Sequence, residues 1–389
     1  MTIKILAEVE QIKKTIIETR RDFHKHPEMG FNELRTAKII ADKLKSYGLG
    51  VKTGIGKTGV IGDLIKDKSF QTVALRADMD ALPIQETSEV EYKSVNDGVM
   101  HACGHDGHMA MLLGAAEVLS QMRDELKVNV RFIFQPAEEG EGGARYVIAD
   151  GALNNVDQIY GLHLWNYQPY GEIGLQSGSV LAAADIIDIW IEGIGGHGAA
   201  PQGTVDAIVV ASNLIMNFQT IISRNTDPLH SAVITIGEIS GGHGFNIIAD
   251  KVKLRGTVRA MTEENRQMIK QRMEEIIEGV ALSYKAKITM DYQDGYPPTV
   301  NHDEPTEIAR QSAQKIGSAI VREPYLSMGA EDFSYYLQKI PGAFVFIGSA
   351  PADEEPMSVP HHCSHFDIDE RALLVGTSLF VQLIKDFSN

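Results

Sequence analysis

The first part of the chain places apolar residues at helical spacing. Ile12, Ile16 and Ile40 fall on helical faces within residues 4–49, and Pro27 interrupts the pattern. Because proline breaks a helix, we expect separate helical segments on either side of it. The apolar runs that follow predict buried strands at 71–80, 128–134, 159–165 and 343–347, and helices at 109–122, 305–316 and 371–387. Strands that alternate with helices in this way are typical of an α/β fold.

The middle of the chain has a different pattern. Apolar and polar residues alternate in 185–191, as they do in a strand with one exposed face. The elements from there on have the order strand, helix, strand, strand, helix, strand, which is typical of a ferredoxin-like α+β sandwich. We therefore expect a discontinuous α/β domain at 1–182 and 295–389, with a mixed sheet flanked by helices, and an inserted ferredoxin-like domain at 183–294.

Composition and charge narrow the class of protein. The 389 residues have a net charge of −16, which would repel a nucleic acid, so we expect no nucleic-acid partner. The first residues show no signal-peptide pattern, and the most apolar run is too short to cross a bilayer. Cys103 and Cys363 are too few for a disulfide framework. We expect a cytoplasmic protein with no membrane partner.

Residues 101–108 read HACGHDGH and combine three His, one Cys and one Asp among small residues. Thiolate, imidazole and carboxylate groups suit borderline divalent metals such as zinc. The glycines permit a tight turn in which neighbouring side chains converge. A polar turn ahead of a helix would explain the glycines but not the concentration of Cys and His. We therefore favour a metal site.

Polar residues follow three of the predicted strands. Asp78 and Asp80 come at the end of the first, Glu138 and Glu139 follow the second, and His163 lies near the end of the third. Functional groups of open α/β sheets gather at the carboxyl ends of strands, so these side chains are expected to lie together. Each also has a structural alternative: a loop cap for the aspartates, a solvated pair for the glutamates, and a core histidine.

Five motifs occur in series along the chain: RADMDALP at 76–83, HACGHD at 101–106, QPAEE at 135–139, GHGAAP at 196–201 and GAEDF at 329–333. Together they resemble the M20 metallopeptidases over essentially the whole chain. The resemblance is strongest to the amidohydrolase branch, subfamily D of this family, which includes hippurate hydrolases, N-acyl-amino-acid deacylases, acetyl-diaminopimelate deacetylases and auxin-conjugate hydrolases. It implies a catalytic domain with two metal ions, interrupted by a lid domain through which subunits dimerise.

The resemblance also implies a set of metal ligands. They fall on Cys103, His105, Glu139, His163 and His362. Cys103 would be shared between two divalent ions in each subunit. Glu139 and His362 would complete one metal site. His105 and His163 would complete the other. Zinc is the metal that these ligands favour most, with manganese, cobalt and nickel as alternatives.

The last motif departs from the family pattern. The family has His, then Ser or Asn, Pro, any residue, Phe and Asp, whereas residues 362–367 read HCSHFD. The spacing to Phe366 selects His362 as the ligand. His361 is the main alternative, and His365 also lies close in sequence.

The expected activity is hydrolysis of the amide bond of N-acyl amino acids through a metal-bound hydroxide, of the aminoacylase or hippurate hydrolase type. Glu138 would be the general base. The resemblance implies that His197 stabilises the tetrahedral intermediate from the partner subunit of a homodimer or homotetramer. Asp78 would orient a ligand imidazole. Asn246 and Arg259 are candidates for binding the carboxylate of the substrate.

Two other functions are compatible with these motifs. A dipeptidase or carboxypeptidase would use the same dinuclear site on a peptide bond. A catalytically inactive, metal-dependent binding protein would be expected to lack the base, whereas Glu138 is present. The preferred acyl group and amino acid depend on loops whose shape the sequence does not reveal.

Overall fold

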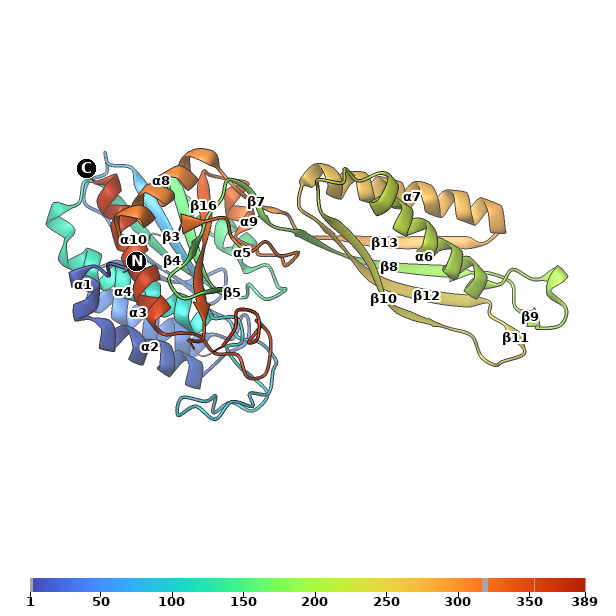
Figure 1. The fold of residues 1–389 in the computed structure, drawn as a ribbon, viewed down its shortest axis with the longest axis horizontal. Helices are drawn as coiled ribbons and strands as arrows, with labels where there is room; N and C mark the ends of the chain where they lie inside the picture. The colour runs from blue at the N-terminus through green and yellow to red at the C-terminus, as the bar shows by residue number, and fades with distance from the viewer. Residues whose placement is uncertain (1–2, 317–320, 353, 389) are drawn as a thin grey trace. The chain divides into compact units, whose positions relative to one another are not determined.

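The computed structural model describes residues 3–316, 321–352 and 354–388. Within these residues the chain forms two compact units (Figure 1). The first unit takes in the described parts of Met1–Gly178, Val300–Tyr325 and Asp332–Asn389, and the second takes in Ser179–Thr299 and Leu326–Glu331. Each unit has its own hydrophobic core.

A mixed sheet forms the centre of the first unit. In spatial order its described strands are β1 (Gly50–Ile55), β2 (Gly59–Leu64), β4 (Asn129–Gln135), β3 (Thr72–Asp78), β5 (Gln158–Pro169), β16 (Gly342–Ala350), β6 (Ile173–Gly174) and β15 (Val321–Arg322). The central strands β4, β3, β5 and β16 run parallel, and their residues are nearly all buried. Uninterrupted apolar runs are expected of strands that are covered on both faces.

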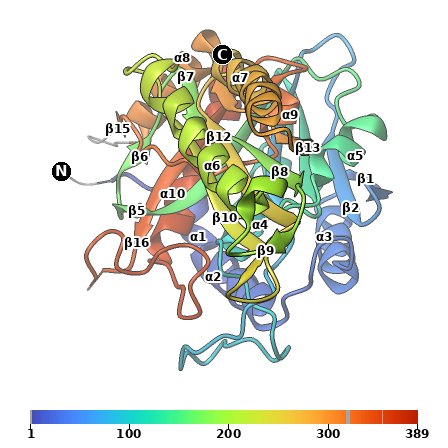
Figure 2. The same cartoon turned by 90° about the vertical axis from the view of Figure 1, so that its right-hand side faces the viewer.

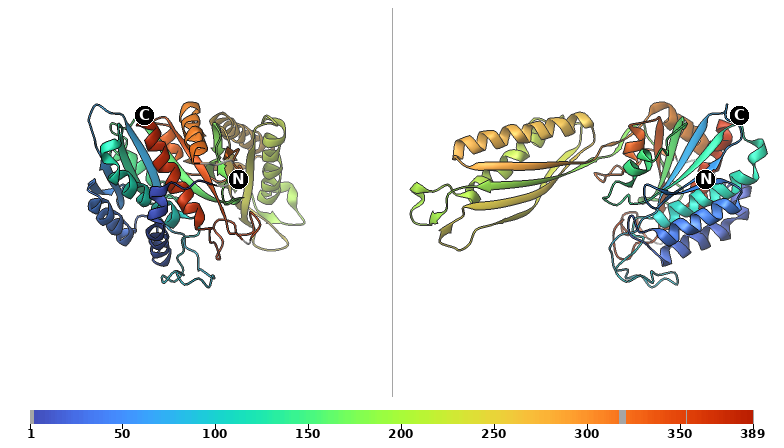
Figure 3. Two further views of the ribbon diagram at one scale, coloured as in Figure 1. Left: turned by 60° about the vertical axis from the view of Figure 1, so that its left-hand side comes forward. Right: turned by 180° about the vertical axis from the view of Figure 1, so that it is seen from behind.

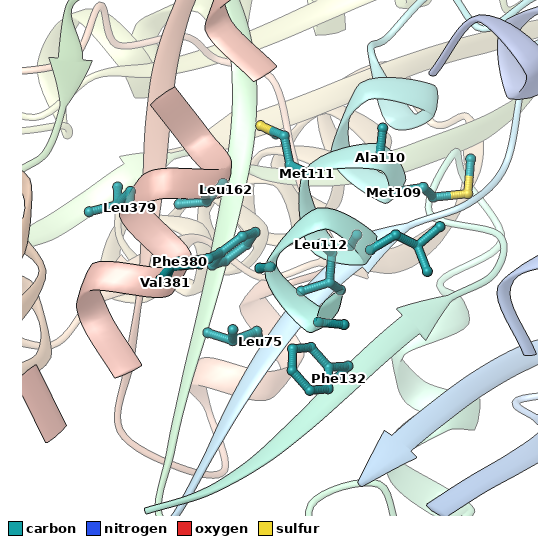
Figure 4. Packing of buried hydrophobic residues seen from close by; sticks show 14 of the residues in the cluster. Leu75, Met109, Ala110, Met111, Leu112, Phe132, Leu162, Leu379, Phe380 and Val381 are labelled. Carbon is teal, nitrogen blue, oxygen red and sulfur yellow. The ribbon is translucent and has the colours of Figure 1, made fainter. Parts of the chain in front are cut away.

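Helices pack on this sheet. Those of the first unit, among the described residues, are α1 (Ala7–Gln11), α2 (Lys13–Lys25), α3 (Leu34–Ser46), α4 (His105–Gln121), α5 (Gly143–Ala149), α8 (Asp303–Lys315), α9 (Ser334–Leu337) and α10 (Arg371–Phe387). α4 contacts α10 as well as α2 and α3 (Figure 3). Figure 4 shows Leu112 of α4 beside Leu75 and Phe132 of the central strands, and Leu162 of β5 near Phe380 of α10. The mixed sheet with flanking helices confirms the expected α/β fold.

The second unit is an antiparallel sheet covered on one face by two helices (Figures 1 and 2). In chain order its main elements are β8 (Ala183–Glu192), α6 (Ala207–Arg224), β10 (Ala232–Gly241), β12 (Lys251–Ala260), α7 (Glu263–Tyr284) and β13 (Lys287–Tyr296). The strands lie in the order β10-β12-β8-β13, which is the ferredoxin-like arrangement expected from the sequence. Short strands occur at β7 (Gly178–Leu181), β9 (Gly196–His197), β11 (Ile247–Ile248) and β14 (Thr299–Asn301).

Three local features differ from the predicted elements. The antiparallel pair β1 and β2 was not predicted, because β1 is largely exposed and β2 has Gly59 and Gly62 among its apolar residues. α4 begins at His105 rather than Met109, so the end of the HACGHDGH segment forms the first helical turn. β5 continues to Pro169, which places His163 in the middle of the strand and not near its end.

Candidate metal centre

The HACGHDGH segment joins a turn to the start of α4. Gly104 adopts a left-handed backbone conformation, with φ of 93°, that residues with a Cβ rarely take. This turn places Cys103 just ahead of the helix and His105 in its first position. The two side chains therefore leave the backbone on either side of a sharp bend and reach the same region.

Five side chains from separate parts of the first unit converge in two groups. The ligand atoms of Cys103, His105 and His163 all lie within 4.8 Å of one another. Those of Cys103, Glu139 and His362 do the same. Cys103 Sγ lies 3.7 Å from His163 Nε2, and Glu139 Oε1 lies 3.8 Å from His105 Nε2 and 3.3 Å from His362 Nε2. The two groups have the same members as the two ligand sets that the sequence implied.

Two buried atoms of this cluster have no hydrogen-bond partner among the described residues. They are His105 Nε2 and Glu139 Oε1. A buried polar atom without a partner is costly, so such atoms usually face a ligand. Because the donor set combines a thiol, imidazoles and a carboxylate, it fits a divalent ion such as zinc.

In two of the clustered histidines, the ring nitrogen that points away from the cluster is hydrogen-bonded to a backbone carbonyl group. His105 Nδ1 lies 2.8 Å from the carbonyl oxygen of Asp80, and His163 Nδ1 lies 2.6 Å from that of Leu164. A carbonyl oxygen can only accept, so Nδ1 carries the proton in both rings. In the neutral form of each ring, the lone pair is then on Nε2, which faces the cluster.

The ring and thiol groups of the cluster have strongly perturbed pKa values. Burial opposes the charged form of His105, but the charge of Asp78 and the bonds to Asp80 and Cys103 raise its pKa well above the ordinary value. Burial holds the pKa of His163 well below the ordinary value. Burial and the neighbouring Glu139 carboxylate raise the pKa of the Cys103 thiol. A divalent cation beside Cys103 would favour its thiolate form instead.

His362 and His361 have different surroundings. His362 has a φ of 66°, its N–H donates to the carbonyl oxygen of Ala102 at 2.8 Å, and its side chain is 50% exposed. Its close contacts with the Cys103 and Glu139 side chains raise the pKa of His362 to about 10. The partly buried His361 accepts a hydrogen bond at Nε2 from the Asn166 N–H at 3.3 Å, and loss of solvent around the ring lowers its pKa to about 3. Within the described part of the chain, neither His361 nor His365 joins the clustered groups.

Asp78 contacts a different imidazole from the expected ligands. His108 Nδ1 donates to Asp78 Oδ1 at 2.6 Å, and His108 Nε2 accepts from the Leu164 N–H at 2.9 Å. Asp78 Oδ2 lies 3.7 Å from His105 Nε2, which is beyond hydrogen-bond distance. Asp78 is therefore placed to orient His108 directly, and through Leu164 the segment that carries His163.

Behind the glutamate pair lies a buried ion network. Arg76 donates to Asp78 Oδ2 and to Asp332 Oδ1, both at 2.8 Å. Burial raises the pKa of Asp332 to about 6. The Asp332 N–H donates to Glu138 Oε1 at 3.3 Å, so the GAEDF motif reaches the side chain proposed as the base.

Asp80 is a site residue whose partners the sequence did not reveal. Its Oδ1 accepts from the Glu138 N–H at 3.0 Å and its Oδ2 from the Glu139 N–H at 2.9 Å. Its position at the end of a strand marked it as a candidate. The contact with two backbone amides could not be predicted, because a hydrogen bond to a backbone N–H leaves no trace in the identity of the residue that donates it.

The other predicted residues lie in the second unit. His197 is an exposed residue of β9, and its Nδ1 accepts from the Ala199 N–H at 3.0 Å. The carbonyl oxygen of Asn246 accepts from the Gly198 N–H at 2.8 Å, which ties the exposed Asn246 to the same turn. Arg259 is a partly buried residue of β12.

No helix within the described ranges is long and apolar enough to cross a membrane.

Comparison with known proteins identifies relatives over nearly the whole chain. Peptidase family M20/M25/M40 matches residues 74–386. The N-acetyl-L-cysteine deacetylase of Bacillus subtilis is 40% identical over 374 residues, which is 95% of this chain and 84% of the relative. The thermostable carboxypeptidase 2 of Saccharolobus solfataricus is 40% identical over an alignment of 390 positions that covers 99% of this chain and 98% of the relative.

A solved structure is similar along its whole length. The Bacillus subtilis YXEP protein, described as a dinuclear metal-binding peptidase from the M20 family, is 36% identical and superposes with a TM-score of 0.84. The match covers 97% of this chain and 98% of that one. The similarity therefore extends over the unit with the clustered side chains as well as the ferredoxin-like unit.

Proposed function

The chain belongs to peptidase family M20/M25/M40 and is a hydrolase of amide or peptide bonds, and on this premise we propose that it cleaves the amide bond of N-acyl amino acids. The observation that carries the proposal is the convergence of the two side-chain groups that share Cys103, with Glu138 beside them. The deacetylase relative, which by its name removes an acetyl group from an amino acid, supports the same substrate class.

We assign the five clustered side chains as ligands of two divalent ions. Cys103 would be shared, Glu139 and His362 would complete one site, and His105 and His163 the other. The membership of His362 in a group, which His361 lacks in the described residues, supports His362. Thiolate and imidazole ligands favour zinc, with manganese, cobalt and nickel as alternatives. When bound, the ions would lower the pKa of a water molecule and polarise the carbonyl of the substrate.

We propose that Glu138 moves the proton. It is buried and adjoins Glu139, and the Asp332 N–H fixes one of its oxygens. A carboxylate in this position can take a proton from water and give it to the leaving amine. The burial of Glu138 also excludes bulk water, which strengthens its electrostatic interactions.

His197 has the tautomer that the proposed oxyanion role requires. Since Nδ1 accepts from the Ala199 N–H, the proton of the neutral ring is on Nε2, which is available to donate. A donor of this kind stabilises the negative oxygen of a tetrahedral intermediate. We propose that this donor acts on the site of the partner subunit. Arg259 and Asn246, in the same unit, are proposed to bind the free carboxylate of the substrate.

We propose that the second unit forms the lid and the contact between two copies of the chain. The edge strand β10 and the neighbouring α6 expose Ile208, Val209, Met216, Val233 and Ile239. An exposed apolar patch that includes a sheet edge is typical of a subunit interface. Val209→Glu should convert a dimer or tetramer to monomers in light scattering. An unchanged molar mass would contradict this placement.

A reducing compartment such as the cytoplasm suits the proposed site. Cys103 and Cys363 are both free thiols. The proposed role of Cys103 requires a thiolate, which oxidation would remove as a ligand.

A second activity is favoured by the carboxypeptidase relative. The same side chains could act on the C-terminal peptide bond of a short peptide, since only the acyl part of the substrate would differ. A hydrolysis screen on protein of known metal content distinguishes the two activities, with acetyl, benzoyl and longer acyl amino acids tested against dipeptides. Faster turnover of the acyl amino acids is expected. Hydrolysis of the peptides alone would replace the proposal with a peptidase activity.

A further inference from the structure

The turn after β4 presents three consecutive N–H groups to two buried carboxylates. The Ala137 N–H donates to Glu33 Oε1 at 2.9 Å. The Glu138 and Glu139 N–H groups donate to the two carboxylate oxygens of Asp80 at 3.0 and 2.9 Å. Successive amides in a turn form a concavity that binds anions. The backbone that carries the proposed base and a proposed ligand is therefore held by two residues that lie far away in the sequence.

Ala137 adopts a backbone conformation that residues with a Cβ rarely take. Its φ is 54°, in the left-handed region. Such a conformation persists only where its surroundings enforce it. The Gly143 N–H donates to the Ala137 carbonyl oxygen at 2.9 Å, and Gly30 lies so close that a Cβ there would be 3.0 Å from the Cβ of Ala137. Glu33 restrains Ala137 from its other side, because the Ala137 N–H donates to the Glu33 carboxylate.

The carboxylate of Glu33 is not used by the helix that this residue begins. Glu33 is the N-cap of α3, where a side-chain acceptor usually bonds to the second or third amide of the helix. Here Glu28 accepts those bonds instead, from the Arg35 N–H at 3.0 Å and the Thr36 N–H at 2.8 Å. The Glu33 carboxylate is left to accept from Thr58 Oγ1 at 2.5 Å and from the turn after β4.

Glu33 is also an unfavourable residue for the stability of the folded state at its position. Its side chain is buried, and among the described residues no basic side chain forms an ion pair with it. Burial raises its pKa to about 7. An unpaired carboxylate in the interior destabilises the folded state. A role in stability alone would be met better by an apolar or amide side chain of similar size.

We propose that Glu33 is a positioning residue that holds the Ala137 amide and thereby sets the direction in which the Glu138 carboxylate projects. The inference rests on the proposed role of Glu138 as general base. Asp80 differs from Glu33 because it also bonds to the amide of Glu139, a proposed metal ligand. Loss of Glu33 should therefore affect proton transfer and spare metal binding, whereas loss of Asp80 should affect both.

Kinetics of matched variants test this separation. Glu33→Ala removes the acceptor, and we expect kcat to fall by about 10- to 100-fold with KM and metal content close to the wild-type values. Glu33→Gln keeps an oxygen for the Ala137 N–H and should retain most of kcat. Thr58→Val removes only the other bond of the same carboxylate, so its kcat should stay within about twofold of wild type. Glu33→Met, which fills the space without an acceptor, should repeat the loss if the alanine variant does not fold.

Hydrogen exchange gives a second measurement that does not depend on activity. The peptide containing Ala137 should exchange faster in Glu33→Ala and at the wild-type rate in Thr58→Val. A kcat of Glu33→Ala within about twofold of wild type, or a loss of kcat that only follows loss of metal, overturns the inference. If the wild-type protein hydrolyses no substrate in the screen, the proposed function fails. Exchange then decides the inference separately: unchanged exchange at Ala137 overturns the positioning role, and faster exchange supports it.

Discussion

Two buried sites, one in each unit, hold their charged groups in different ways. In the second unit, the buried carboxylate of Asp185 is saturated with donors. Arg266 donates to both of its oxygens at 2.9 and 2.5 Å, the Tyr292 hydroxyl donates at 2.7 Å, and the Gly295 N–H donates at 2.9 Å. This network joins β8, α7 and β13, and every bond in it connects elements of the fold. Its role is structural.

The cluster of the first unit also contains buried charged groups, but two of its buried atoms, His105 Nε2 and Glu139 Oε1, have no hydrogen-bond partner among the described residues. The saturated network of the second unit has no capacity for a ligand, whereas the unsaturated cluster of the first unit does. Buried charge alone therefore does not mark a functional site. Unpartnered atoms that converge on one point do.

The largest expected effect concerns the proposed base in the first unit. Glu138→Gln removes the proton acceptor while keeping size and polarity, so kcat should fall by about 10²- to 10⁴-fold. Metal content measured by elemental analysis should remain at the wild-type level. Substantial remaining hydrolysis would show that Glu138 is not the base. It would also weaken the contrast between a functional cluster in the first unit and a structural network in the second.

Replacing a shared ligand should affect both proposed metal sites. Cys103→Ala removes the side chain common to the two groups, so metal content should fall and activity should be lost with it. Cys363→Ser is the matched control, since Cys363 is absent from the clustered groups of the described residues. Unchanged metal content in Cys103→Ala would show that the cluster has been misread.

The saturated network of the second unit should respond in stability and not in metal binding. Arg266→Met leaves the Asp185 carboxylate buried without its cation, which should lower the free energy of unfolding by about 3–5 kcal/mol. Lys270→Met, at the more exposed pair of Lys270 Nζ with Asp294 at 2.8 Å, should cost less than about 1 kcal/mol. The metal content of the folded Arg266→Met protein should equal that of wild type. A loss of metal in this variant would contradict the purely structural role of the Asp185 network.

The smallest effect tests whether burial in the first unit costs stability. The pKa of Glu33 is raised from 4.5 to about 7, so the folded state holds this proton more tightly than the unfolded state. Its contribution to stability is therefore present below pH 4.5 and is lost as the pH rises toward 7. Asp80 is the charged group whose field adds to this shift.

Glu33→Gln should remove this pH dependence. Relative to wild type, the variant should gain up to about 3 kcal/mol in unfolding free energy between pH 5 and pH 8, measured by chemical denaturation. A constant difference between the two proteins across this range would show that Glu33 does not titrate as its surroundings imply.

The motifs predicted the clustered side chains better than the residues that hold the neighbouring backbone in place. Cys103 and His105 could be selected because Cys and His are scarce and lie close together in one short segment, and His163 because it falls within an apolar run. Asp80 was placed at a strand end, but its bonds to two amides depend on how the turn after β4 folds. Nothing in the sequence indicates the contact of Glu33 with Ala137, since an acceptor side chain at the start of a helix usually bonds to the first amides of that helix.

The helices and strands also differ in how well the sequence predicts them. The central strands and buried helices have strong apolar patterns and were predicted. The largely exposed β1 has no such pattern, and its partner β2 is interrupted by glycines. The partner of Asp78 could not be predicted either. His105 and His108 are both near Asp78, and only the packing of α4 selects His108 for the short hydrogen bond.

The place of β16 in the sheet has a consequence for synthesis. β16 lies between β5 and β6, and its Gly342 pairs with Ile159 of β5, although the whole second unit separates them in sequence. A ribosome therefore delivers six of the eight described strands of this sheet long before β16, and His362 emerges later still. The ferredoxin-like unit has all its main strands available earlier and can fold while the chain is still growing. The sheet of the first unit can be completed only after β16 has been made, so the proposed metal ligands come together late in the synthesis of the chain.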